Sequence, residues 1–274
     1  MTHDHDRGLA HDLTVLADFA ARRRALLKWG LGLGALPLLA CATTSDGDEA
    51  MTDGSAGSGS DGTSNGTCAQ IPEETAGPYP GDGTNGKNAL TLSGIVRSDI
   101  RSSLAGATGV AEGVLLTVTL TVVDSQNDCA PIAGHAVYLW HCDRAGNYSM
   151  YSPAAASENY LRGVQETDEN GQVTFTTIFP ACYSGRWPHI HFEVYPSLDV
   201  ASSGQNAVST SQLALPEADC IEVFATDGYE ASVSNLAQIT LDSDNVFSDG
   251  SEQQLAATSG SADSGYTAQL TVAI

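Results

Sequence analysis

The residues best suited to chemistry are His189 and His191, which are separated by one apolar residue. Because successive side chains of a β-strand point to opposite faces, both imidazoles lie on one face of the strand that this segment predicts. Two imidazoles in that arrangement can share one metal ion, and iron, zinc and copper all accept nitrogen ligands. An isolated pair of this kind is also typical of an amphipathic surface strand. The motif alone therefore leaves a metal site and a surface strand open.

Two tyrosines occupy comparable places after other predicted strands. Tyr148 stands in a polar turn, Gly146-Asn147-Tyr148, and Tyr183 follows Phe179-Pro180-Ala181-Cys182. Each tyrosine taken alone is more typical of a packing or hydrogen-bonding residue than of a ligand. Their order along the chain, with both tyrosines before the histidine pair, favours a role as ligands.

Together with further segments, these motifs form an ordered set that resembles the intradiol ring-cleaving dioxygenases, the protocatechuate and catechol dioxygenase family. The resemblance covers roughly residues 68 to 222, and the combined pattern is specific although no single piece is. The further segments are Glu74-Thr75-Ala76-Gly77-Pro78-Tyr79, Leu161-Arg162-Gly163-Val164-Gln165-Glu166-Thr167-Asp168 and Gly185-Arg186.

The resemblance implies a mononuclear, non-haem Fe(III) centre as the cofactor. Carried over by motif, its ligands are Tyr148, Tyr183, His189 and His191. Phenolate is a hard anionic donor that favours Fe(III), whereas a site of two histidines and one carboxylate suits Fe(II). In the family the second tyrosine leaves the iron when substrate binds and accepts a proton, a role that the resemblance gives to Tyr183.

The implied reaction is O₂-dependent cleavage of a catechol-type ring to a cis,cis-muconate-type diacid. Arg186 matches a family arginine that stabilises negative charge on the ring, and Gln212 matches a glutamine that lines the substrate pocket. The expected partners are a small aromatic diol and O₂. Two alternatives stay open: an inactive, surface-anchored β-sandwich that acts as a binding module, and a zinc or copper site on the histidine pair.

The elements that must position these residues are predicted to be β-strands. Apolar runs after Leu90 are short, rich in Val, Thr and Ile, and separated by Gly, Asn, Asp and Ser, which favours a mainly β, antiparallel β-sandwich. Residues 168–171 (Asp-Glu-Asn-Gly) predict a turn into the next strand. The predicted strands are Val114–Val123, His135–His141, Gln172–Ile178, His189–Tyr195, Cys220–Phe224, Ala237–Leu241 and Thr267–Ile274.

The first 41 residues predict an export signal. Arg23-Arg24 precedes a short apolar stretch and resembles a twin-arginine motif, and Leu38-Leu39-Ala40-Cys41 resembles a lipobox whose cysteine is lipidated. Residues 42–67 are rich in Ser, Gly and Asp and predict a flexible linker. Residues 68–274 then form the folded domain, in a protein expected to be an exported envelope lipoprotein that meets the membrane only through this anchor.

The net charge argues against some classes of binding partner, and the number of cysteines limits how many can form disulfides. The chain of 274 residues has a net charge of −22, which argues against binding to nucleic acid or to anionic lipid. Export makes disulfides plausible, but the folded domain holds five cysteines, so at least one thiol must be free or intermolecular. The five are Cys68, Cys129, Cys142, Cys182 and Cys220.

Overall fold

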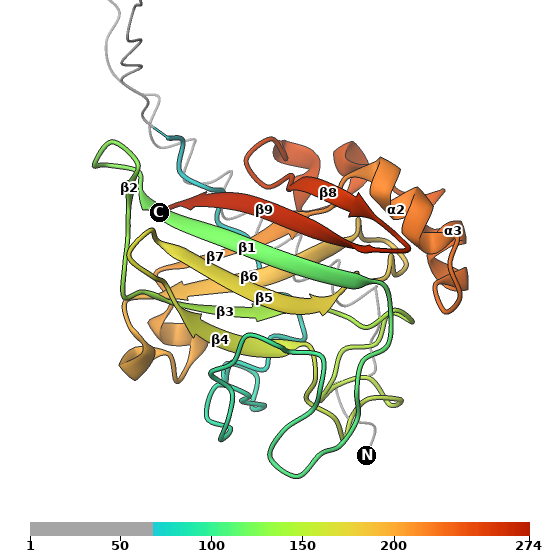
Figure 1. The fold of residues 1–274 in the computed structure, drawn as a ribbon, viewed down its shortest axis with the longest axis horizontal. Helices are drawn as coiled ribbons and strands as arrows, with labels where there is room; N and C mark the ends of the chain where they lie inside the picture. The colour runs from blue at the N-terminus through green and yellow to red at the C-terminus, as the bar shows by residue number, and fades with distance from the viewer. Residues whose placement is uncertain (1–67) are drawn as a thin grey trace, which may run out of the picture.

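The computed structural model describes residues 68–274. The predicted signal (residues 1–41, with Cys41) and the predicted linker (42–67) lie outside the described residues. Within the described part, two β-sheets pack face to face, and the two α-helices lie at one end of them (Figure 1). None of the helices in residues 68–274 has the length and apolar character that a membrane span requires.

The two sheets differ in how their strands pair. The first contains β1 (Leu115–Asp124), β2 (Ala130–Pro131), β5 (Gln172–Ile178), β8 (Ala257–Ser261) and β9 (Gly265–Ala273). The second has the order β4 (Arg162–Glu166), β3 (Ala136–Trp140), β6 (His189–Tyr195), β7 (Ser209–Ala214), and all its pairs are antiparallel. The predicted antiparallel β-sandwich is confirmed, with one parallel pair, β1 and β9 of the first sheet, that was not predicted. Parallel neighbours need a long connection, and here most of the domain lies between the two strands.

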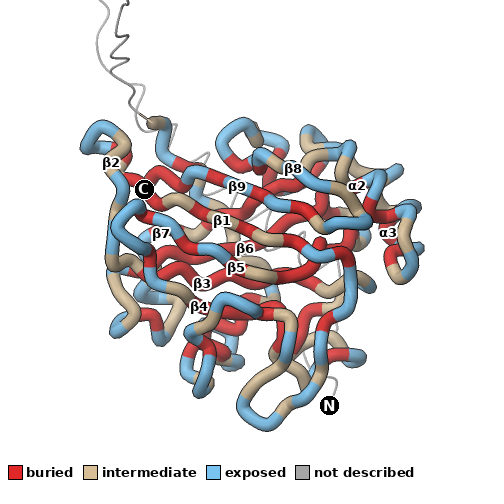
Figure 2. Tube along the Cα trace, in the orientation of Figure 1, coloured by how far each residue is buried: buried red, intermediate tan, exposed pale blue. Residues whose placement is uncertain are grey.

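The core fills the space between the sheets. Phe175 of β5 and the side chains of Ile190, Phe192 and Val194 on β6 are fully buried there, in one cluster with alternate residues of β1 and β9. The outer face of β6 is buried as well, because Tyr195 packs in a second cluster with residues of the chain before β1, including Leu90. Figure 2 shows the resulting burial of the central strands.

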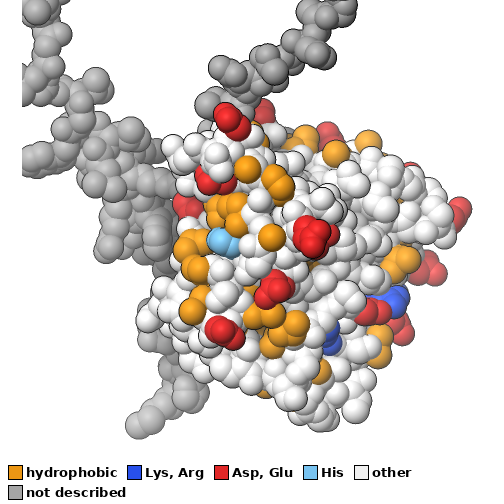
Figure 3. All heavy atoms as spheres, turned by 60° about the vertical axis from the view of Figure 1, so that its left-hand side comes forward, with side chains coloured by type: hydrophobic (Ala, Val, Ile, Leu, Met, Phe, Trp, Pro, Cys, Tyr) orange, Lys and Arg blue, Asp and Glu red, His pale blue; other side chains and the backbone are white. Residues whose placement is uncertain are grey.

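The surface carries the acidic character that the composition predicts. Carboxylates are spread over the face drawn in Figure 3, with hydrophobic side chains between them and few basic groups. This distribution agrees with the net charge of −22.

Most of the predicted strands are confirmed, two with the same bounds, β5 and β6. The predicted turn before β5 is present, with Gly171 at a φ of 72° and its amide bonded to the carbonyl of Asp168. Strands β2, β4, β7 and β8 were not predicted, since they are very short or their sequences are polar or rich in small residues.

The predicted strand Cys220–Phe224 is wrong, because these residues belong to helix α2 (Glu217–Phe224). Cys220, Val223 and Phe224 are buried together, at the spacing that places residues on one helix face. Pro216 precedes the helix and acidic residues occupy its first turn, both typical of a helix start.

The predicted strand Ala237–Leu241 is also wrong. Ala237 caps helix α3 (Glu230–Leu236), and Leu241 begins a short 3-10 helix, η4 (Leu241–Ser243). Thr240 caps η4 through its side chain, which accepts a hydrogen bond from the Ser243 amide. The alternating pattern of this segment meets no partner strand, so local capping decides its structure.

Of the five cysteines in the described residues, two form a disulfide and three are free, which agrees with the expectation of at least one free thiol. Cys68 and Cys129 form a disulfide, which ties the start of the described chain to the loop after β1. Cys142, Cys182 and Cys220 are free and buried.

A buried arginine holds the segment that covers the outer face of β6. Arg162 is 1% exposed and makes no ion pair among the described residues, yet all five of its N–H groups have oxygen partners at 2.6–3.0 Å. The acceptors are the carbonyls of Tyr79, Pro80 and Ser149 and the hydroxyls of Tyr138 and Ser149. Ser149 follows Tyr148, so this clamp helps to position a predicted iron ligand.

We expect Arg162→Lys to destabilise the fold by about 3 kcal/mol, because an ammonium group has three donors and would leave buried acceptors unpaired. Chemical denaturation of the purified protein measures the change. The matched control is Arg101→Lys, whose side chain is 39% exposed and pairs with Asp99; there we expect a change within about 0.5 kcal/mol. Equal effects in the two variants would contradict the clamp.

Candidate metal centre

Strand β6 presents the two histidines in the way that its alternation predicts. His189 and His191 share one face, and both are at most 3% exposed. The register is held on both sides, because Trp140 of β3 and Gln212 of β7 are the neighbours of His191. The pair therefore lies in the middle of a sheet, which excludes the interpretation as a surface strand.

Tyr148 reaches the histidines from the connection between β3 and β4. The carboxylate of Asp143 accepts hydrogen bonds from the amides of Ala145 and Asn147 and so forms the turn that precedes the tyrosine. The Tyr148 amide donates to the Ser152 hydroxyl at 2.9 Å. These local bonds fix the backbone on both sides of a side chain that is 2% exposed.

Tyr183 comes from the turn between β5 and β6. Helix α3 supports this turn, because the Ser232 hydroxyl accepts from the Cys182 amide and the Asn235 side chain donates to the Cys182 carbonyl. The turn closes with a bond from the Arg186 amide to the Tyr183 carbonyl. A helix that the sequence patterns did not predict thus holds one of the predicted ligands in place.

The four side chains meet around one nitrogen atom. From His189 Nε2 the distances are 3.1 Å to His191 Nε2, 3.2 Å to Tyr183 Oη and 3.4 Å to Tyr148 Oη. The two phenol oxygens are 3.5 Å apart. All four residues that were predicted as iron ligands are therefore brought together.

The state of His189 is set by its other ring nitrogen. Nδ1 lies 2.5 Å from the carbonyl oxygen of Trp187, which can only accept, so Nδ1 carries the proton. In the neutral ring Nε2 then has a free lone pair, directed toward the other three groups. A backbone carbonyl that orients a histidine in this way is typical of metal ligands.

His191 is oriented by packing. Its ring stacks on the indole of Trp140, with centroids 4.9 Å apart and planes 5° from parallel. On another side Gly77, at a φ of 72°, leaves room for the ring, since a Cβ there would lie 3.4 Å from His191 Cε1. Gly77 lies in a segment that the resemblance includes and Trp140 lies in a predicted strand, but no local pattern gave either residue this role.

Burial shapes the charge of all four groups. Burial lowers the pKa of His189 and of His191 well below the usual value for histidine, so both rings are neutral at pH 7. Burial also raises the pKa of Tyr148 well above 10 and that of Tyr183 to about 12, where the nearby Arg186 charge opposes the rise. Neutral imidazoles are ready to bind a cation, and the phenols would release their protons to solvent when they bind it.

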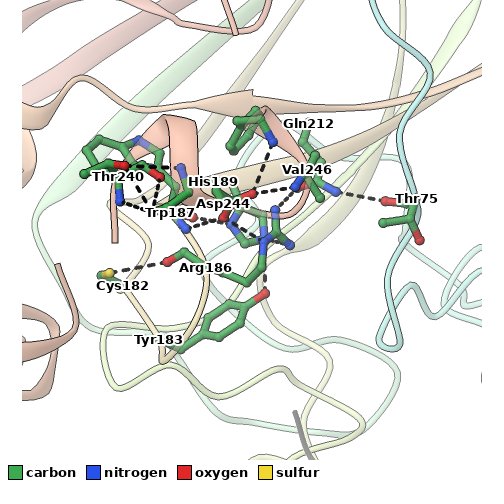
Figure 4. Close-up of polar contacts among 12 residues, drawn as sticks. Thr75, Cys182, Tyr183, Arg186, Trp187, His189, Gln212, Thr240, Asp244 and Val246 are labelled. Atoms are coloured by element: carbon green, nitrogen blue, oxygen red, sulfur yellow. Dashed lines mark hydrogen bonds and ion pairs between the residues drawn. The ribbon is translucent and has the colours of Figure 1, made fainter. Parts of the chain in front are cut away.

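Arg186 stands beside this cluster and is held by two partners (Figure 4). Nη2 donates to Gln212 Oε1 at 2.7 Å and Nε donates to Asp244 Oδ2 at 2.9 Å, while Nη1 lies 3.4 Å from His189 Nε2. Gln212 in turn donates to the Thr75 carbonyl. Both residues predicted for substrate binding, Arg186 and Gln212, thus lie at the site. Asp244 gave no signal in the sequence, because a single acid in a turn resembles any other.

Two polar residues near the motif have other partners. His141 Nε2 lies 2.6 Å from the Thr177 hydroxyl and Nδ1 faces the Cys142 carbonyl; burial lowers its pKa to about 4, so it is a neutral core histidine. Glu193 accepts a hydrogen bond from the Tyr195 hydroxyl, and burial raises its pKa to about 8.

The donor set fits a hard trivalent cation. Two neutral imidazole nitrogens and two phenol oxygens converge on one point, and Arg186 Nη1 lies 3.4 Å from His189 Nε2, beyond normal hydrogen-bond length. Among residues 68–274 no group of three or more His, Cys, Asp and Glu side chains is arranged to hold a metal. A metal bound at this place therefore needs the tyrosines.

Comparisons with known proteins identify similar sequences and folds. A family model described as "Dioxygenase" matches residues 98–193. The intradiol ring-cleavage dioxygenase from Tetranychus urticae is 27% identical over 76% of this chain and 95% of its own, with a TM-score of 0.57. A second solved dioxygenase is 27% identical, covers 76% of this chain and 94% of its own, and has a TM-score of 0.58.

One curated relative adds a local match. Chlorocatechol 1,2-dioxygenase from Rhodococcus opacus is 40% identical over 53 residues, which is 19% of this chain and 21% of the relative. The fold, the family model and the solved structures lead to the same family. The resemblance to the intradiol ring-cleaving dioxygenases that the sequence predicted is therefore confirmed.

Proposed function

We propose that this protein cleaves a catechol-type aromatic ring between its two hydroxylated carbons, using O₂ and a ferric ion. Tyr148, Tyr183, His189 and His191 hold the iron. Both oxygen atoms of O₂ enter the product, a cis,cis-muconate-type diacid. The observation that carries the proposal is the convergence of two phenol oxygens and His191 Nε2 within 3.4 Å of His189 Nε2.

The chemistry of the donors favours Fe(III) over the alternatives. Phenolate oxygen is a hard donor, and two such anions stabilise the ferric state over softer or divalent ions. A zinc or copper site on the histidine pair alone would lack a third ligand among the described His, Cys, Asp and Glu residues. Ferric iron supplies a Lewis acid for a catechol held through both of its oxygens.

Tyr183 is the residue best placed to move a proton. It is the more exposed of the two tyrosines, and its phenolate oxygen, Oη, can accept one of the two hydroxyl protons that a catechol must lose. Arg186 lies close enough to stabilise the phenolate before this transfer, since its positive charge opposes the rise in the pKa of Tyr183. Tyr148 is deeply buried and keeps the role of a permanent ligand.

Arg186 has a second task during ring attack. Its Nη1 faces the centre, where negative charge develops on the ring, and a fixed positive charge in a water-poor site stabilises that charge strongly. Gln212 holds Nη2 and thereby keeps the guanidinium in line with the pocket. A binding module without turnover would need neither this charge nor the four converging donors.

We expect His189→Ala and His191→Ala to abolish iron binding, because each removes a neutral donor from a four-residue site. Tyr148→Phe should weaken and shift the visible absorption band that tyrosinate-to-iron charge transfer produces. Iron content, the visible spectrum and O₂ uptake with catechol are the measurements. His135→Ala is the matched control and should keep full iron and colour, since His135 precedes β3 and His191 pairs with Trp140 at the other end of that strand. Stoichiometric iron with an unchanged spectrum in all three ligand variants would contradict the ligand set.

We further propose that the protein is exported by the twin-arginine route and anchored in the cell envelope through a lipid on Cys41. Support comes from the sequence alone: Arg23-Arg24 and the Leu38-Leu39-Ala40-Cys41 motif stand in the order that such signals require. Twin-arginine export moves folded proteins, which suits an enzyme that acquires its metal before transport.

Cys41→Ser should release the protein from membranes or block its maturation, because the lipid has no other predicted attachment point. Membrane fractionation and the mass of the mature N-terminal peptide measure this. If the variant fractionates and migrates like the wild type, the lipoprotein proposal fails, while the proposed reaction is unaffected.

A further inference from the structure

Asp244 is a fully buried acid that lies beside the candidate centre and beyond the last residue of the family match. It stands between the short helices η4 (Leu241–Ser243) and η5 (Phe247–Asp249). An ionised carboxylate at zero exposure requires a charged partner and several hydrogen bonds. Both are present, and they lead to the catalytic machinery proposed above.

The carboxylate accepts four hydrogen bonds, two on each oxygen. Oδ1 accepts from the amides of Val246 and Phe247 at 2.8 and 3.2 Å, which fix the carboxylate relative to its own turn. Oδ2 accepts from Arg186 Nε at 2.9 Å and from the Trp187 amide at 2.6 Å. The anion is therefore held rigidly by its own segment and presented to the residues just before β6.

The guanidinium is planar, so its direction is set when two of its nitrogens are held. Nε is held by Asp244 and Nη2 by Gln212. Nη1 is then the nitrogen that points to the centre, 3.4 Å from His189 Nε2 (Figure 4). Gln212 alone would leave the guanidinium free to rotate about a single neutral hydrogen bond.

A second link runs from the same carboxylate to a predicted ligand. The Trp187 amide donates to Asp244, and the Trp187 carbonyl accepts from His189 Nδ1. The indole of Trp187 is anchored by its bond to the Leu215 carbonyl. The tautomer of His189 is nevertheless set by the Trp187 carbonyl, and the Leu215 bond holds Trp187 independently of the carboxylate, so iron binding does not require Asp244.

We propose that Asp244 is a positioning residue, which aims Arg186 Nη1 at the reacting ring and leaves iron binding to the four ligands. This inference rests on the proposed function. It predicts that an acid outside the family match controls turnover through Arg186 and not through the metal.

The first test observes the contact itself in the metal-free, full-length protein. In a ¹H–¹⁵N spectrum the Arg186 Nε–H should give a slowly exchanging signal, assigned by its loss in Arg186→Lys. Asp244→Asn should abolish the slow exchange, because an amide has one acceptor oxygen and would turn its NH₂ group toward two donors. A fast-exchanging Arg186 Nε–H in the wild type would overturn the inference without any Asp244 variant.

The second test is a double-mutant cycle on the iron-loaded enzyme with catechol. Asp244→Asn and Arg186→Ala should each lower kcat by about a hundredfold while iron content and the catechol-induced spectral shift are kept. If Asp244 acts through Arg186, adding Asp244→Asn to Arg186→Ala should lower kcat by no more than about twofold further. Asp244→Glu, which keeps the charge, should recover part of the activity. The matched control is Asp99→Asn, which removes the acid from the exposed Arg101 pair and should leave kcat unchanged.

Equal losses of kcat in both backgrounds would make Asp244 a general support of the fold and overturn the inference. Loss of iron in Asp244→Asn but not in Arg186→Ala would overturn it too, because the carboxylate would then serve the ligands. A wild-type protein that binds iron and cleaves no catechol would refute the proposed reaction, and the exchange measurement would still decide whether Asp244 holds Arg186.

Discussion

The site depends on one constraint, the burial of both faces of β6. The side chains of a strand alternate between its two faces. In β6 the apolar side chains lie on one face and the polar side chains on the other, and polar groups that are buried need hydrogen-bond partners or a ligand. Ile190 and Phe192 fill the core between the sheets, and His189 and His191 point the other way. A slip of one residue would exchange the two sets, so the pairing with β3 and β7 that stabilises the fold also places the imidazoles.

Covering the outer face of β6 brings two arginines into the interior, and they are stabilised differently. Arg162 is surrounded by neutral oxygens that take all five of its donors, so its charge is spread over fixed dipoles and serves to hold loops. Arg186 has a carboxylate partner, Asp244, and one nitrogen directed to the candidate centre. The first arrangement is structural, and the second leaves a positive charge available at the place where negative charge would develop.

The same burial explains why the donor set suits a metal better than acid–base chemistry without one. Low solvent exposure keeps His189 and His191 neutral and raises the pKa of Tyr148 and Tyr183, so none of the four groups exchanges protons readily at pH 7 on its own. A bound cation reverses this balance, since it takes the imidazole lone pairs and displaces the phenol protons. Burial therefore both stabilises the fold and gives the four side chains protonation states that favour metal binding.

The sequence by itself determined the features that follow from local patterns. Alternation located β5 and β6 to the residue, and motif order along the chain identified the two tyrosines, the two histidines and Arg186 as one set. Local patterns gave the wrong secondary structure where packing against distant segments decides it. Residues 220–224 have a strand-like composition, but they form a helix that buries one face. The parallel pairing of β1 with β9 has no local signature in the sequence. Only the tertiary structure brought Asp244 to Arg186 and α3 to the Tyr183 turn, because a buried charge or carbonyl takes its partner from whatever segment packs beside it, however distant in sequence.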